Sequence, residues 1–207
     1  MSAAIISLIV FSTSSLIAVA AVGRISSVIS GPVPTRIQMF RKLEYFDASA
    51  NELSGHADLL ILPSLKYINL SNNKFVTAGF RRFHKSYHTL QEMDLSSNRI
   101  AQDVGQVFQN MPPTLERSNL SNNTIGGVLP RGFPIENQVR FFAMANNNLS
   151  GPLPDVTRTF SNLEHINLAN NYLTGTIQDT LWKLEELVSP TNCGNIKDFL
   201  DVVLIPF

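Results

Sequence analysis

The chain has 207 residues, of which 44% are hydrophobic and 15% are charged, and this balance fits one folded unit of moderate size. Lysine plus arginine and aspartate plus glutamate number 16 each, so the formal net charge at pH 7 is zero. Because no basic stripe is present, the composition excludes nucleic acid as the expected partner. The single cysteine, Cys193, excludes an intrachain disulfide.

Residues 1–23 carry no charged side chain and are rich in alanine, isoleucine, leucine, valine and serine. Such a run predicts a secretory signal peptide, with Ala18-Val19-Ala20 as a small-x-small cleavage site. It is also nearly long enough for an N-terminal membrane anchor, which would attach the chain to a membrane through these residues. A decayed copy of the repeat described next is a third alternative. The sequence leaves the three open.

A periodic phrase begins after this segment and is marked by asparagines at intervals of 22 to 25 residues: Asn51, Asn73, Asn98, Asn123, Asn147 and Asn171. Each asparagine follows apolar residues eight, five and three positions earlier and precedes another two positions later. The clearest copy is Leu65, Ile68, Leu70, Asn73 and Phe75. Only Ala48 and Ser118 lack a large apolar side chain at the three leading positions. The phrase is the leucine-rich pattern L-x-x-L-x-L-x-x-N-x-L.

The spacing of the phrase predicts a short strand in every copy. Apolar residues two apart share one face, so Ile68 and Leu70 should point inward and Tyr67, Asn69 and Ser71 outward. One coil cannot enclose a core, but stacked coils can. The sequence therefore predicts an α/β solenoid over residues 24–190, a right-handed superhelix with a parallel concave β-sheet. The asparagine ladder should be structural, with each amide bonding to backbone groups of its own and adjacent coils.

A second signature, L-x-G-x-x-P, follows several copies of the phrase, as in residues 149–154 and 125–130. Its glycine favours a tight turn, and its proline ends a short extended segment. Mixed apolar and polar spacing predicts short helices or 3₁₀ turns on the convex side, over Phe80–His88, Val104–Gln109 and Thr180–Glu186. Residues 191–207 are predicted to cap the open end of the core.

With both signatures, residues 25–190 resemble the extracellular leucine-rich repeats of plant receptor-like kinases and receptor-like proteins. The resemblance implies a secreted protein or one on the extracellular side of the plasma membrane. It also implies protein or peptide ligands, a co-receptor kinase as a further partner, and a part in defence or developmental signalling. A polygalacturonase-inhibitor-like role is a nearby variant. The chain lacks the paired-cysteine caps and the kinase signature of that family.

In this architecture the outward strand positions carry the predicted binding residues. The candidate ligand-binding column is Tyr45, Tyr67, Glu92, Arg117, Phe141 and His165. It is flanked on one side by Asp47, Asn69, Asp94, Asn119, Ala143 and Asn167, and on the other by Glu44, Lys66, Gln91, Glu116, Arg140 and Glu164. Aromatic rings and arginine are enriched at binding hot spots, whereas a merely solvated face with cross-strand pairs is the alternative.

Catalytic residues, metal ligands and cofactor motifs are not predicted. His84 and His88 stand four apart without a third ligand nearby, and Cys193 has no partner histidine motif. We therefore expect a non-enzymatic recognition module that binds a protein or peptide through its concave face. The alternative is a structural or intracellular scaffold, or a non-functional receptor fragment. Sequons predict N-glycosylation, given secretion, at Asn69, Asn119, Asn122 and Asn148.

Overall fold

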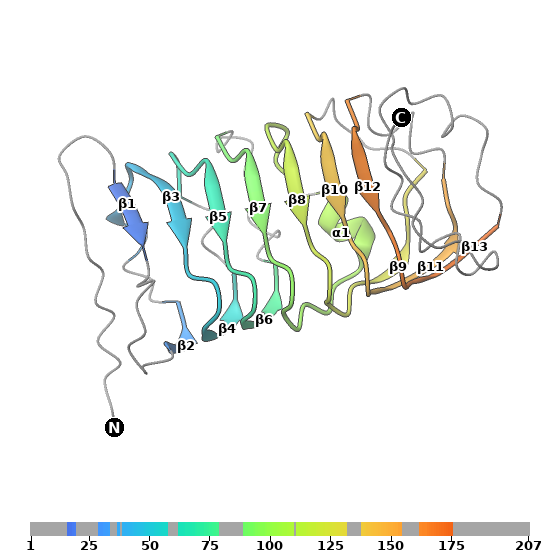
Figure 1. Ribbon diagram of the computed structural model, residues 1–207, viewed down its shortest axis with the longest axis horizontal. Helices are drawn as coiled ribbons and strands as arrows, with labels where there is room; N and C mark the ends of the chain where they lie inside the picture. Colours follow the sequence, from blue (N-terminus) through green and yellow to red (C-terminus); the bar gives the residue numbers. More distant parts are fainter. Residues whose placement is uncertain are drawn as a thin grey trace.

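The structure is a computed structural model that describes residues 16–19, 29–33, 37, 39–57, 62–78, 89–109, 111–131, 138–154 and 162–175. These residues wind into coils stacked side by side (Figure 1). The predictions for Phe80–His88, Thr180–Glu186, the cap over 191–207 and Cys193 concern residues outside those ranges.

Every copy of the repeat phrase contributes one strand to a seven-stranded parallel sheet. In spatial order its strands are β1 (Leu16–Val19), β3 (Leu43–Asp47), β5 (Tyr67–Asn69), β7 (Glu92–Asp94), β8 (Arg117–Asn119), β10 (Phe141–Ala143) and β12 (His165–Asn167). The parallel solenoid predicted from the spacing is therefore present. β1 lies within residues 1–23 and pairs with β3, and the signal, anchor and decayed-repeat alternatives for that segment stay predictions.

The segments that follow the ladder asparagines, several of them with the L-x-G-x-x-P signature, form strands of their own along the lower side of Figure 1. One three-stranded parallel sheet contains β2 (Ser30–Pro32), β4 (Glu52–His56) and β6 (Lys74–Thr77), and another contains β9 (Gly126–Val128), β11 (Asn148–Pro152) and β13 (Tyr172–Thr174). The sequence predicted short extended segments here but not their pairing. We call the two sheets together the second-sheet side.

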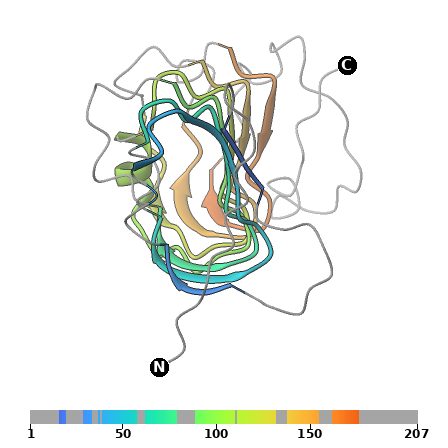
Figure 2. The ribbon, with the colours of Figure 1, turned by 90° about the vertical axis from the view of Figure 1, so that its left-hand side faces the viewer.

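The convex side carries α1 (Val104–Gln109), where a short helix was predicted. Asp103 caps it, because its carboxylate Oδ1 accepts the backbone N–H of Gly105 at 2.8 Å. Figure 2 shows α1 on the opposite side of the coil from the seven-stranded sheet. The same aspartate restricts the next coil: a side chain at Gly127, where φ is +102°, would place its Cβ 2.4 Å from Asp103 Oδ2.

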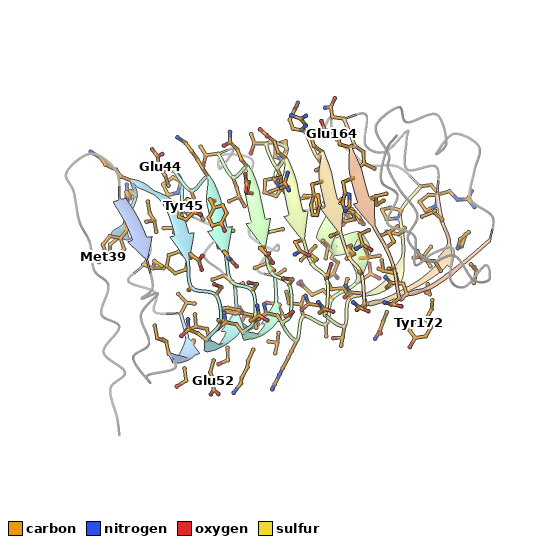
Figure 3. The ribbon with its side chains drawn as sticks, viewed as in Figure 1. Met39, Glu44, Tyr45, Glu52, Glu164 and Tyr172 are labelled. Atoms are coloured by element: carbon orange, nitrogen blue, oxygen red, sulfur yellow. The ribbon has the colours of Figure 1, made fainter. Side chains whose placement is uncertain are left out.

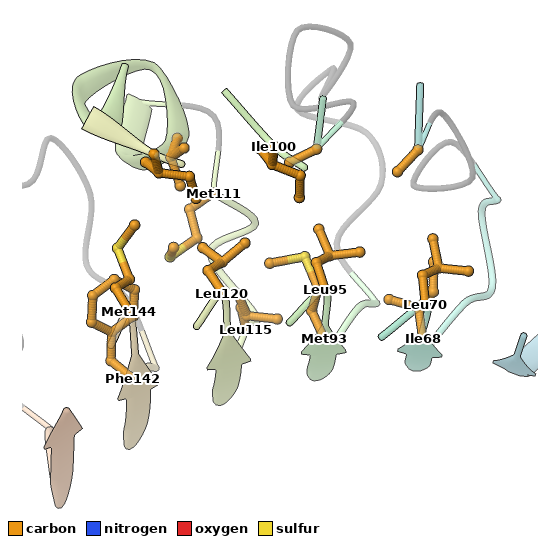
Figure 4. Packing of buried hydrophobic residues seen from close by; sticks show 14 of the residues in the cluster. Ile68, Leu70, Met93, Leu95, Ile100, Met111, Leu115, Leu120, Phe142 and Met144 are labelled. Carbon is orange, nitrogen blue, oxygen red and sulfur yellow. The ribbon is translucent and has the colours of Figure 1, made fainter. Parts of the chain in front are cut away.

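The core is a column of inward side chains that runs between the sheet and the convex side (Figure 4). Ile68 and Leu70 are fully buried, and their counterparts in neighbouring coils lie beside them. Ser118 takes one of these positions at 0% exposure, and its Oγ has no hydrogen-bond partner in the described structure. Ser71, predicted to point outward, is buried: it lies beyond the end of β5 and donates its Oγ–H to Oδ1 of the outward residue Asn69 at 2.8 Å.

The ladder asparagines lie where the chain turns out of the seven-stranded sheet. Asn98 shows the pattern: its Nδ2 donates to the carbonyls of Leu70, Leu95 and Ser96 at 3.0 to 3.1 Å, and its Oδ1 accepts the Phe75 N–H at 3.0 Å. Each amide thus joins its own coil to the preceding one. The residue before each ladder asparagine has a φ between 53° and 57°, a left-handed conformation: Ala50, Asn72, Ser97, Asn122, Asn146 and Asn170.

Candidate binding face

The strand register places the predicted ligand-binding column on one line across the seven-stranded sheet. Consecutive strands pair its members one to one: Tyr45 with Tyr67, Tyr67 with Glu92, Glu92 with Arg117, Arg117 with Phe141, and Phe141 with His165. The residue after each of them in its strand is buried, so their own side chains stand on the side away from the core. We call this surface the outer face.

At one end of the column two phenol rings stack. The centroids of Tyr45 and Tyr67 are 3.9 Å apart, and the ring planes differ by 3°. Tyr45 is 42% exposed, whereas Tyr67 is half-buried. Burial, followed by the hydrogen bond and charge of Tyr45 and the charge of Asp47, raises the pKa of Tyr67 to about 12. Tyr67 is therefore an uncharged phenol at neutral pH.

A second cluster contains Arg117, Phe141 and His165, on the consecutive strands β8, β10 and β12. The Phe141 and His165 rings stack at 4.4 Å with planes 2° apart, and the Arg117 guanidinium carbon lies 4.8 Å from the Phe141 centroid. This is the geometry of a cation–π contact. Burial, and secondarily the positive charge of Arg117, lowers the pKa of His165 below its ordinary 6.5. The histidine is therefore neutral at neutral pH, and Arg117 supplies the positive charge of the cluster.

Arg117 has the carboxylate of Glu92 as a neighbour in the column but contacts the ring of Phe141 instead. Glu92 is paired with Arg117 in register, yet no ion pair joins them among the described residues, and the guanidinium lies over Phe141 instead. Both side chains are exposed. The centre of the outer face therefore presents one carboxylate and one guanidinium side by side, each accessible to a partner.

On the flank of the column that contains Asn69, Asp94 and Asn119, these side chains form hydrogen bonds with nearby residues. Asp94 Oδ1 accepts the Ser96 N–H at 2.8 Å, and Asn69 and Asn119 accept the N–H two residues on in the same way. Asn69 also donates to Asp47 at 3.3 Å, and Asn119 donates to Asp94 at 3.2 Å. These side chains close the strand ends and link adjacent coils.

The other flank carries ion pairs between adjacent coils. Lys66 Nζ lies 2.9 Å from Glu44 Oε2, and Arg140 pairs with Glu164. Figure 3 shows Glu44 and Glu164 at one edge of the seven-stranded sheet. Because these pairs are exposed, they contribute little to stability, but they balance four of the charges beside the column; Glu116 has no ion pair in the described part of this flank.

The four sequons differ in exposure. Asn69 and Asn119 direct their Nδ2 atoms to aspartates, as described above. Asn122 is exposed and accepts a hydrogen bond from Asn146 at 2.9 Å. Asn148 is exposed at the start of β11 on the second-sheet side. Asn148 thus offers the most open side chain of the four.

Sequence reasoning missed exposed apolar residues on the second-sheet side. Val128 on β9 is 54% exposed. Tyr172 on β13 is 69% exposed (Figure 3). The L-x-G-x-x-P segments, treated as paired strands with outward positions, would have identified them. His56, at the end of β4, lies on the same side with its Nδ1 at 2.7 Å from Thr77 Oγ1.

Within the described ranges, no group of three or more histidine, cysteine, aspartate or glutamate side chains is arranged to hold a metal ion. No helix in the same ranges is long and apolar enough to cross a membrane.

Comparison with known proteins identifies the architecture. The Leucine Rich Repeat family model matches residues 64–85 and 162–184. A crystal structure of PEPR1-AtPEP1 superposes with a TM-score of 0.62 and 25% identity, over 76% of this chain and 22% of that one. The fold is a leucine-rich-repeat solenoid. The structure of Pollen Receptor Kinase 3 superposes on it with a TM-score of 0.56 and 25% identity, over 73% of this chain and 78% of that one.

The leucine-rich-repeat chain is also similar to plant receptor-like proteins in sequence. It is 32% identical over 112 residues to Receptor-like protein 9b of Arabidopsis thaliana, a match that covers 53% of this chain and 12% of the relative. The chain therefore spans about an eighth of the length of the receptor-like relatives it matches. The resemblance stated from the two sequence signatures is confirmed by these matches.

Proposed function

We propose that this protein is a non-enzymatic recognition module that binds a protein or peptide through the outer face, the concave face of the sequence prediction. The observation that carries the proposal is the column of stacked side chains that runs across the strands. Aromatic rings and a guanidinium are fixed there in contact with one another, while the Tyr45 ring and the Arg117 side chain remain exposed.

Stacking prepares these side chains for binding. Immobilising a side chain on association costs about 0.5–1.5 kcal/mol, and a ring already held by its neighbour avoids part of that cost. Tyrosine, phenylalanine and arginine also combine a large contact area with directional polar groups. The Tyr45–Tyr67 surface would take an apolar or aromatic side chain of the ligand, and the Phe141–His165 pair would take a second one.

Charge would orient the ligand. Ion pairs occupy Glu44, Lys66, Arg140 and Glu164 on the flank beside the column. Arg117 and Glu92 are the exposed charges of the column at the centre, with Glu116 beside them on the flank. An acidic group of the ligand would bind Arg117, and a basic group would bind Glu92. An extended peptide lying across the strands could meet both, because neighbouring strands are about 4.8 Å apart.

The cellular setting belongs to the proposal as well. Similarity to receptor-like proteins supports a secreted protein or one on the extracellular side of the plasma membrane, in defence or developmental signalling. Residues 1–23 would then act as a signal peptide or anchor, and a co-receptor kinase would be a further partner. Exposure favours Asn148 and then Asn122 as glycan acceptors over Asn69 and Asn119.

Binding can be tested without a known ligand. Peptides selected from a random phage-displayed library on the unsubstituted chain would be assayed against Tyr67→Ala/Arg117→Ala, with Tyr172→Ala/Arg99→Ala as control. Both pairs remove one tyrosine and one arginine, but Tyr172 and Arg99 are exposed outside the column. We expect at least about a tenfold loss of affinity, or 1.4 kcal/mol, only in the first variant.

The fold of both variants would be checked by circular dichroism and thermal unfolding. Equal affinity in the first variant and the unsubstituted chain, or an equal loss in the control, would refute binding through the outer face. Compartment is tested separately by expression in a secretory host. Glycan at Asn148 or a new N-terminus near Ala21 supports the surface protein, and an unprocessed cytosolic product supports the scaffold alternative.

A further inference from the structure

The stacked tyrosines of the outer face bring two oxidisable rings into contact. Tyr45 and Tyr67 occupy paired positions of β3 and β5, so the sheet itself fixes their alignment. The ring centroids are 3.9 Å apart and the planes differ by only 3°, which places the ring carbons of one phenol against those of the other. Figure 3 shows Tyr45 on the exposed surface of the seven-stranded sheet.

We propose that Tyr45 and Tyr67 form a site of oxidative coupling, at which hydrogen peroxide and a haem peroxidase join the two rings by a carbon–carbon bond. The product would be an intramolecular dityrosine that links one coil of the solenoid to the next. This inference is independent of the proposed binding function, since it concerns the reactivity of the pair itself.

The reaction balances with hydrogen peroxide as the oxidant and needs no group of the protein other than the two phenols. Each phenol loses one electron and one proton to the oxidant and becomes a neutral tyrosyl radical. The two radicals combine at ring carbons adjacent to their hydroxyls, and the hydrogen on each of those carbons returns to the neighbouring oxygen as the rings regain aromaticity. The chain loses two hydrogen atoms in total, and one hydrogen peroxide molecule is reduced to two water molecules.

Accessibility and proximity favour this pair. Tyr45 is 42% exposed, so an oxidant can take an electron from it, and the partner ring is already in contact. Holding two reactants together converts a bimolecular encounter into a unimolecular step, with effective molarities that reach about 10⁵ M or more in well-oriented cases. Tyr67 is half-buried, and its pKa of about 12 keeps it a neutral phenol that can release its proton with the electron.

A third tyrosine offers an internal comparison. Tyr172 is 69% exposed on β13, on the second-sheet side, and the described part of the chain gives it no ring contact. Exposure alone would make it the more reactive of the described tyrosines towards an oxidant. Contact geometry, in contrast, selects the Tyr45–Tyr67 pair for intramolecular coupling.

A covalent link here would have a structural effect. The chain has one cysteine and cannot form an intrachain disulfide, so no other side-chain crosslink of that kind closes a coil. A bond between β3 and β5 would restrict the unfolded chain, and we expect it thereby to raise the melting temperature. It would also fuse the two rings into one rigid surface on the outer face.

The test is to treat the dilute full-length chain with a haem peroxidase and hydrogen peroxide. Intact mass should show a monomer lighter by two hydrogen atoms, and a protease digest should yield a crosslinked peptide pair containing Tyr45 and Tyr67. Dityrosine fluorescence and a higher melting temperature should accompany the product. Tyr45→Phe and Tyr67→Phe should each abolish the crosslink, because phenylalanine keeps the ring but not the phenol, whereas Tyr172→Phe should retain it.

The outcomes are decisive in either direction. An unchanged monomer mass, coupling through Tyr172 or Tyr87, coupling only between molecules, or a crosslink that survives in Tyr67→Phe would each overturn the proposal. Mapping the crosslink in the unsubstituted chain decides the matter even where a phenylalanine variant does not fold.

Discussion

The ladder asparagines should contribute measurably to stability, and Asn98→Ala is the sharpest perturbation. The Asn98 side chain donates to the carbonyls of Leu70, Leu95 and Ser96 and accepts the N–H of Phe75 at 3.0 Å. Alanine removes all four hydrogen bonds and adds no steric conflict. The cost depends on which of the freed backbone groups keep another partner.

All three carbonyls keep a second donor. These donors are the side-chain amides of Asn73 and Asn123 and the backbone N–H of Asn72. The N–H of Phe75, a residue with 0% exposure, instead loses the oxygen to which it donates. One buried unsatisfied donor costs about 1–3 kcal/mol, so the free energy of unfolding should fall by about that amount.

Urea denaturation followed by circular dichroism would measure the change, with Asn148→Ala as the matched control. Asn148 is exposed, so its replacement should stay within about 0.5 kcal/mol of the unsubstituted chain. If Asn98→Ala costs no more than the control, the hydrogen bonds of the ladder do not stabilise the fold and the reasoning fails.

Three other outcomes are expected. Ser118→Ala should raise the free energy of unfolding by about 1 kcal/mol because it removes a buried hydroxyl without a partner, and a fall in urea midpoint would contradict this. Gly127→Ala should lower the free energy of unfolding by about 1–3 kcal/mol, because the new Cβ would meet the Asp103 carboxylate. The loss should be smaller in an Asp103→Ala background. If the effects of the two substitutions simply add, the two residues do not interact. The pKa of His165 is lower in the folded chain than its ordinary 6.5, so His165 of the unfolded chain is protonated first as the pH falls. The free energy of unfolding should therefore decrease as the pH falls below 6.5, and the contribution of this residue is fully present above that pH. A His165→Gln variant with the same pH profile would argue against the shift.

The sequence predicted the strands that the six copies of the repeat phrase form, with their parallel order and their facing, because a period of two and a regular repeat length determine all three. Ile68 and Leu70 point inward and Tyr67 outward, as predicted, and the α1 segment is helical. The adjacency of Tyr45 and Tyr67 likewise follows from equal positions in consecutive copies of the phrase. The stacking of their rings does not, since it depends on side-chain rotamers chosen in the packed structure.

The sequence could not predict which neighbour a long side chain contacts. Glu92 and Phe141 flank Arg117 equally in register, and only the packed structure places the guanidinium over the ring. It also could not predict the second-sheet side, because strands of three to five residues, four of which contain a glycine, lack the apolar alternation that signals a strand. The left-handed residues before the ladder were equally hidden, since alanine and serine serve there as well as asparagine.

The ladder amides form hydrogen bonds no further than the preceding coil, and this limits how such a chain can evolve. Asn98 bonds within its own coil and to the coil before it, and Asn73 and Asn123 do the same. Duplication or loss of one entire repeat in the gene would therefore leave every remaining junction intact. A shift of one or two residues inside a phrase would break the junctions on both sides. The molecule is thus free to change in length by whole modules and is constrained within each of them.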